Sequence, residues 1–137
     1  MNIFKMFKIA FSTKDTSKEI EDMIYNIITS TDAELELKFS TLAESNLEEL
    51  LSQLPTLEPR DLALALLSLQ NATYSTIVRD TLTNALDSKF PAVREGAIYA
   101  LGSFLEEDKT LIPILIAKLH SDTNWAIKQA IRSVLYY

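Results

Sequence analysis

Apolar residues recur along most of this chain at intervals of three and four, with polar residues between them. This spacing follows the period of an α-helix, about 3.6 residues, and places the apolar side chains on one face. Each such stretch predicts a short amphipathic helix, and only a few residues separate one stretch from the next. The apolar stripes run through residues 20–28, 47–54, 62–67, 78–86, 93–104, 111–119 and 127–135.

Residues at the ends of these stripes predict where the helices begin and end. Pro59 and Pro91 stand just before apolar stripes, where a proline fits the first turn of a helix. Ser45-Asn46 and Thr123-Asn124 precede two other stripes, and hydroxyl or amide side chains of this kind can cap the first turn. Pro55 directly follows the stripe at 47–54 and is expected to stop that helix.

One segment, ELELKF at residues 34–39, has an ambiguous pattern. Its apolar and polar residues alternate, as they do in a half-buried strand. The same region also fits a helix, with Leu35, Phe39, Leu42 and Ala43 on one face. Because a single strand among helices has no neighbour with which to form hydrogen bonds, we predict a helix here.

The later helices form a repeat. Arg60, Arg94 and Lys128 are spaced by 34 residues. The same offset aligns one set of acidic or amide residues and three sets of small or apolar residues. Short connections predict that consecutive helices pack as antiparallel hairpins. The aligned sets are Asp61, Glu95 and Gln129; Ala63, Ala97 and Ile131; Leu66, Ala100 and Val134; and Leu67, Leu101 and Leu135.

The pattern around residues 86–102, LDSKFPAVREGAIYALG, resembles that of the HEAT repeat family, and LHSDTNWAIKQAIRSVL at 119–135 repeats it. A leucine ends the first helix, a turn with an aspartate follows, and then come a proline, Val-Arg and a helix rich in small residues. In the second segment Trp125 stands near the proline position. The matching residues of the first segment are Leu86, Asp87, Pro91, Val93, Arg94, Ala97 and Leu101.

The resemblance implies an all-α fold, a short right-handed α-solenoid of antiparallel helical hairpins with about eight or nine helices. A single domain is expected over residues 1–137. It would consist of an N-terminal amphipathic cap segment at 1–15, a divergent helical hairpin at 16–45 and three better-matched repeats at 46–137. In the family, the arginine at the Arg94 position bonds to a turn aspartate and forms a ladder between repeats, so Asp87 is its expected partner.

The N-terminal segment MNIFKMFKIAF allows two interpretations. Its apolar residues fall on one side of a helix, and they can cover the exposed end of the helical core or lie on a membrane surface. It is far shorter than the roughly 20 apolar residues of a membrane span, and lysines interrupt it, unlike a secretory signal. We favour the cap and expect a cytoplasmic protein without a membrane role.

Charge is unevenly distributed along the chain. The net charge is −6, and residues 16–58 alone hold ten acidic residues and two lysines, a formal charge of −8. An acidic surface repels nucleic-acid phosphates and attracts basic protein surfaces, although it can also serve only to keep the protein soluble. We therefore expect a protein partner, with a basic surface, and no nucleic acid.

The sequence offers little for catalysis. There is no cysteine, His120 is the only histidine, and neither a glycine-rich phosphate loop nor a His-Glu metal pair occurs. His120 ends a helix, where a cation interacts favourably with the last carbonyl groups. We predict a protein that is not an enzyme and that uses no cofactor and no metal.

The predicted function is a non-catalytic protein–protein interaction module that binds its partner on the concave helix face. Trp125 is expected to fill the core at a repeat junction, whereas Tyr99 points away from the buried stripe. The alternatives are an immunity or antitoxin-like protein that neutralises a basic toxin, and a HEAT-like lyase or hydroxylase-type enzyme. The predicted partner-binding residues are Asp61, Leu64, Ser68, Glu95, Ile98, Tyr99, Gln129, Arg132 and Tyr136.

Overall fold

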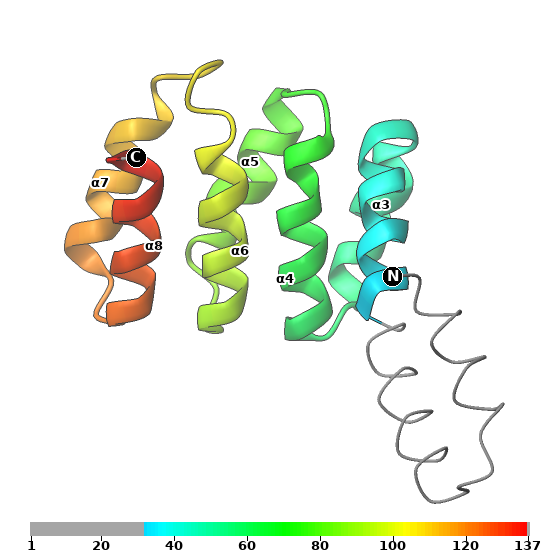
Figure 1. Ribbon diagram of the computed structural model, residues 1–137, viewed down its shortest axis with the longest axis horizontal. Coiled ribbons are helices and arrows are strands. Elements are labelled where there is room, and N and C mark those ends of the chain that lie inside the picture. Colours follow the sequence, from blue (N-terminus) through cyan, green and yellow to red (C-terminus); the bar gives the residue numbers. More distant parts are fainter. Residues whose placement is uncertain (1–31, 137) are drawn as a thin grey trace, which may run out of the picture. The chain divides into compact units, whose positions relative to one another are not determined.

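The computed structural model describes residues 32–136 of the chain (Figure 1). Contacts between Cα atoms divide the chain into two compact units, Met1–Lys38 and Phe39–Tyr137. The predictions for the N-terminal cap segment and for the stripe at 20–28 fall outside the described residues, and a single domain over 1–137 stays a prediction. The packing below is that of the second unit.

Every regular element within residues 32–136 is a helix. The ambiguous segment 34–39 is helical, as predicted, and seven of the expected eight or nine helices lie in this described part. They cover residues 32–45, α3 (Leu47–Gln53), α4 (Pro59–Ser68), α5 (Thr76–Ala85), α6 (Pro91–Gly102), α7 (Leu111–Ser121) and α8 (Trp125–Leu135), with 3₁₀ turns η1 (Leu54–Thr56) and η2 (Leu69–Asn71).

The boundary residues act as the sequence predicts. Pro59 and Pro91 are the first residues of α4 and α6. The Asn46 side chain accepts a hydrogen bond from a backbone N–H in the first turn of α3. Asn124 does the same at α8, where it accepts hydrogen bonds from two backbone N–H groups. Pro55 lies in the 3₁₀ turn that follows α3.

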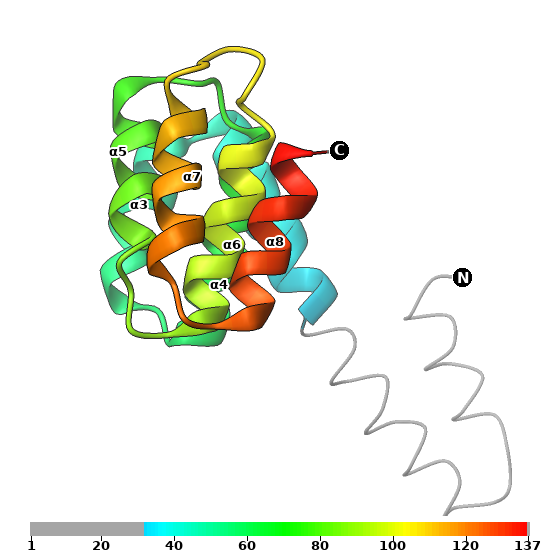
Figure 2. The ribbon, with the colours of Figure 1, turned by 90° about the vertical axis from the view of Figure 1, so that its left-hand side faces the viewer.

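The helices of the second unit form two layers. Helices α4, α6 and α8 lie side by side and run in the same direction, and α5 and α7 lie behind them (Figures 1 and 2). Helix α6 is at the centre, because it packs against α4, α5 and α8. The fully buried side chains of the core include Leu50, Val78, Leu82, Ala97, Leu101, Leu111, Leu115, Ile127 and Ile131.

Burial shows that the spacing between α4 and α6 is 32 residues and not the predicted 34. Ala65 and Ala97 are both fully buried, as are Leu69 and Leu101, whereas Ala63 is only half-buried. The first residues of the two helices are also 32 positions apart. The 34-residue spacing does hold between α6 and α8, where Ala97 and Ile131 are both buried.

Helices α4 and α6 approach closely at Gly96. A Cβ atom at this position would lie 2.6 Å from the backbone oxygen of Ala63, closer than two such atoms can pack. Gly96 therefore permits the close contact that its place in the helix suggests, and this contact offsets the low helix propensity of glycine.

An ion pair joins consecutive hairpins at one end of the helices. The Arg94 Nε atom lies 2.9 Å from Asp122 Oδ2, and Nη2 lies 3.4 Å from Oδ1. The Arg94 side chain also donates a hydrogen bond to the backbone oxygen of Ser88. Because only 13% of the Arg94 side chain and 4% of the Asp122 side chain are exposed, water does not compete strongly for this pair.

Asp122 is the acceptor at the centre of this cluster. Burial disfavours its charged form, but a hydrogen bond from the backbone N–H of Asn124 and the charges of Arg94 and Lys118 outweigh burial and lower its pKa. The prediction that Asp87 is the partner of Arg94 is wrong. Asp87 is 87% exposed and lies 3.7 Å from Lys118 instead, because Arg94 turns toward the following hairpin.

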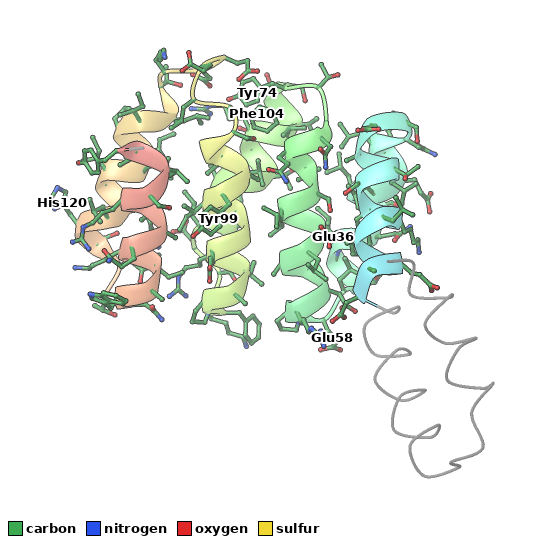
Figure 3. All side chains as sticks on the ribbon, in the orientation of Figure 1. Glu36, Glu58, Tyr74, Tyr99, Phe104 and His120 are labelled. Atoms are coloured by element: carbon green, nitrogen blue, oxygen red, sulfur yellow. The ribbon has the colours of Figure 1, made fainter. Side chains whose placement is uncertain are left out.

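A second polar cluster joins the hairpins at the opposite end of the helices. Tyr74, before α5, donates a hydrogen bond to Asp108, before α7, and its ring packs on Phe104 (Figure 3). Hydrogen bonds from Thr110 and Tyr74 hold the Asp108 pKa at about 2, and burial together with the bond to Asp108 raises the Tyr74 pKa to about 12. The hairpins are thus tied at both ends.

We expect Gly96→Ala to destabilise the protein by about 1–3 kcal/mol, although alanine is the better helix former by about 0.5–1 kcal/mol. The added methyl group must push α6 away from the α4 backbone. Urea denaturation measures the effect. Glu107→Gln, an exposed substitution, is the control, and equal stability of the two variants would show that the close contact is not needed.

Arg94→Ala should lower the free energy of unfolding by about 3–5 kcal/mol, because Asp122 would remain buried without its main counter-ion. Asp87→Ala, at an exposed carboxylate, should change it by no more than about 0.5 kcal/mol. Thermal melts of both variants separate the two aspartates. A larger loss of stability for Asp87→Ala than for Arg94→Ala would show that Asp87, the partner predicted from the sequence, is the one that matters.

The pKa of Asp108 gives stability a defined pH dependence. Its pKa in the folded protein, about 2, lies below the ordinary value of 3.8, so its contribution is complete above the ordinary pKa and disappears as the pH falls through about 2. Asp108→Asn should therefore be less stable than the wild type at neutral pH, and the difference should close in acid. In urea titrations, a difference that stays constant down to this range would contradict the assignment.

Candidate protein-binding surface

The position of each residue around α6 decides which neighbour it meets. Val93, Ala97 and Leu101 face the core and are buried. Gly96 faces α4. Gly102 faces α8, because an added Cβ there would lie 2.7 Å from the Val134 side chain. The remaining side of α6 faces away from α5 and α7.

Glu95 and Tyr99 occupy that remaining side. Glu95 is exposed, and Tyr99 is 39% exposed near the middle of the helix (Figure 3). Successive residues differ by about 100° around a helix, so these two residues, four apart, stand one above the other. They match the sequence prediction, which placed both opposite the buried stripe.

Two residues of the predicted strip are not on the surface. Ile98 is fully buried, because its side of α6 is the one that α8 covers. Ser68 is 3% exposed, and its hydroxyl donates a hydrogen bond to the backbone oxygen of Leu64 within the same helix. Contrary to the prediction, neither residue offers a side chain to a partner.

The 32-residue spacing also changes which residues of α4 lie beside Tyr99. The equivalents of Glu95 and Tyr99 are Ala63 and Leu67, both half-buried. Asp61 and Leu64, which the 34-residue spacing selected, are half-buried as well, but they occupy other positions around α4. The α4 positions equivalent to Glu95 and Tyr99 are therefore both apolar.

On α8, the residues equivalent to Glu95 and Tyr99 are Gln129 and Ser133, and both are exposed. Arg132 donates a hydrogen bond of 2.7 Å to the Gln129 side chain. These positions continue the surface across the three parallel helices. We call this surface the outer strip, and its members are Ala63, Leu67, Glu95, Tyr99, Gln129 and Ser133.

Arg132 and Tyr136 are exposed, as predicted, but at the end of the row of helices and not within the strip. They are the equivalents of Ile98 and Gly102, the positions by which α6 faces α8. Since no hairpin follows α8 within the described residues, the same positions are open on α8. The structure thus separates the predicted binding residues into two surfaces.

Trp125 is the clearest residue that the sequence analysis misplaced. It was expected in the core, but 70% of it is exposed. As the first residue of α8 it is the equivalent of Pro91, which is also exposed. Its place at the proline position could have indicated that it is exposed, because that position lies outside the buried stripe.

His120 is the one histidine of the sequence, and carboxylates are the other candidate metal ligands. His120 lies exposed in the last turn of α7 (Figure 3). No group of three or more histidine, aspartate or glutamate residues that could hold a metal ion occurs among residues 32–136. No helix in this same region has the length and apolarity needed to span a bilayer.

Comparison with known families accounts for the helical hairpins. A family model described as HEAT repeats matches residues 47–135, from the start of α3 to the end of α8. Comparisons with curated proteins and with solved structures find no significant match. The match covers more than half of the sequence and all of the hairpins whose packing is described above. The chain belongs to the HEAT repeat family.

Proposed function

We propose that this protein is a non-catalytic module that binds another protein through the outer strip. HEAT repeats generally mediate protein–protein interactions, and the strip crosses three parallel helices. The two polar clusters join the hairpins of α6 and α8, and α4 packs closely on α6 at Gly96. A surface of this kind needs no catalytic group. It needs a fixed shape, apolar area and a few polar groups that select the partner.

Tyr99 is the observation that carries the proposal. It is a large aromatic side chain, 39% exposed, in the middle of the central helix of the row. Tyrosine is favoured at the centres of interfaces, because its ring buries apolar area and its hydroxyl can still form a hydrogen bond. The equivalent residues on the neighbouring helices, Ala63, Leu67 and Ser133, are small or apolar.

Glu95 gives the strip its preference for a basic partner. Its exposed carboxylate stands one helical turn from Tyr99 and can accept hydrogen bonds from an arginine or lysine. The right-handed superhelix predicted from the sequence would place this strip on its concave side. The proposed role is the binding of another protein, without an immunity role or an enzymatic one.

The test is a double substitution in the strip. Tyr99→Ala with Glu95→Ala should reduce partner affinity by at least about tenfold, since each is exposed and neither is part of the core. Affinity purification with mass spectrometry identifies the partner, and calorimetry with the purified partner measures the affinity. The melting temperature of the variant shows whether its fold is intact.

Ile77→Ala with Asp80→Asn is the matched control on α5, in the other layer. Both residues are exposed, and the pair likewise removes one apolar side chain and one negative charge. It should leave the affinity unchanged. Full binding by the folded strip variant, or equal losses in the two variants, would rule out the outer strip as the binding surface.

A further inference from the structure

No hairpin follows α7–α8 within residues 32–136, so in this part of the chain α7–α8 leaves open the side that the hairpin α5–α6 uses to pack on the next one. In α6 this side includes Arg94, Ile98 and Gly102, which contact the following hairpin or face it. The 34-residue spacing between α6 and α8 carries these positions to Lys128, Arg132 and Tyr136, and carries Pro91 to Trp125. On α8 the side therefore holds two cations and two large aromatic residues.

Helix α7 contributes apolar residues to the same side. Arg79 on α5 reaches forward to Asp108 at 3.4 Å, which identifies the side of α5 that faces the next hairpin. The buried pairs Val78 with Leu111 and Leu82 with Leu115 set a spacing of 33 residues between α5 and α7. Arg79 and Thr83 then correspond to Ile112 and Ile116, of which Ile116 is 37% exposed.

Exposure distinguishes this end of the row from an ordinary surface. Trp125 is 70% exposed and Tyr136 is 73% exposed, the two highest values among the large apolar side chains of the described residues. We call this surface the C-terminal face, made of Ile112, Ile116, Trp125, Lys128, Arg132 and Tyr136. Exposed aromatic residues that lie together on one face indicate an interaction surface.

The C-terminal face is basic, in a protein whose net charge is −6. The only acidic residue between 111 and 136 is Asp122, and its carboxylate is buried and bound to Arg94. Lys128 and Arg132 therefore have no acidic neighbour within α7 or α8. A partner for this face must supply negative charge together with apolar area.

The other end of the row has the opposite charge. Residues 39–58, up to the start of α4, contain four glutamates and no lysine or arginine. All four, Glu44, Glu48, Glu49 and Glu58, are exposed. Helix α3 lies at the end of the row away from α7 and α8 (Figure 1).

We propose that the C-terminal face of one copy binds the acidic segment 39–58 of a second copy, so that the protein associates head to tail. Lys128 and Arg132 would then meet glutamates of the second copy, and Trp125 and Tyr136 would be covered at the same time. Such a contact joins two different surfaces, so a second copy leaves one face of each kind open and further copies can add. This association is independent of the outer strip.

The only tryptophan of the chain reports directly on this contact. Trp125 is at the C-terminal face, and its fluorescence should shift to shorter wavelength when another copy covers it. Sedimentation velocity of the full chain over a range of concentrations should show a rising average mass. The affinity should fall by at least about tenfold between low and high salt, because exposed charges are screened.

Complementary charge reversals test the pairing itself. One variant carries Lys128→Glu and Arg132→Glu, and the other carries Glu44→Lys and Glu48→Lys. Each should be monomeric alone, because the first variant has two acidic ends and the segment 39–58 of the second has lost its net negative charge. An equimolar mixture should associate again, since each end of one variant complements an end of the other.

Glu106→Lys with Glu107→Lys in the loop before α7 is the matched control. It makes the same change in net charge as the second variant, at exposed positions away from both ends of the row. This variant alone should associate with the same affinity as the wild type. Trp125→Ala should weaken association and, being exposed, should not unfold the protein.

A wild-type protein that stays monomeric at low salt, with no change in tryptophan fluorescence, would overturn the proposal and leave the face to an acidic partner of another kind. An equal loss of association in the control variant and in the Glu44→Lys, Glu48→Lys variant would overturn it as well. Net charge alone would then explain the result. Failure of the mixed variants to associate would show that these two ends do not meet.

Discussion

The ion pair between Arg94 and Asp122 fixes how one hairpin meets the next. Apolar packing between helices is not directional, so on its own it allows neighbouring hairpins to slide or rotate. A guanidinium bound by two of its nitrogens to a buried carboxylate permits one arrangement only. The α6 and α8 parts of the outer strip depend on this pair, because it joins α6 to the loop that precedes α8.

Small residues determine how closely the helices of the front layer can pack. Gly96 places the backbone of α6 against that of α4, and Gly102 leaves room for Val134 of α8. With these contacts at opposite sides of one helix, α6 sets the distance to both neighbours. The distances from Tyr99 to the α4 and α8 residues of the outer strip therefore depend on these two glycines.

Much of the fold follows from residues that act locally. Pro59, Pro91, Asn46 and Asn124 mark helix starts because their effect depends on the first turn alone. Burial of Ala97 follows from its place in an apolar stripe. The family could also be identified from the pattern around Arg94, and the family match agrees with it.

The binding surface could be predicted only in part, because it depends on neighbours that the sequence of one helix does not specify. Helical periodicity separates the core side of α6 from the rest, which was enough for Tyr99 and Glu95. It cannot tell which of the other sides a later helix covers, and so Ile98 was placed on the surface. The choice of Asp122 over Asp87 likewise depends on the direction in which Arg94 turns.

The hydrogen bond between Tyr74 and Asp108 has a consequence for how such a protein can lengthen. These residues are 34 positions apart and occupy corresponding loops, yet one is a donor and the other an acceptor. Tandem duplication of the segment 91–124 would reproduce the Arg94–Asp122 pair in each copy. At the opposite end it would place two copies of Asp108 in neighbouring loops, where two carboxylates repel each other. Gene duplication alone would thus give a poorly matched array, and a longer chain would need a further substitution at this position.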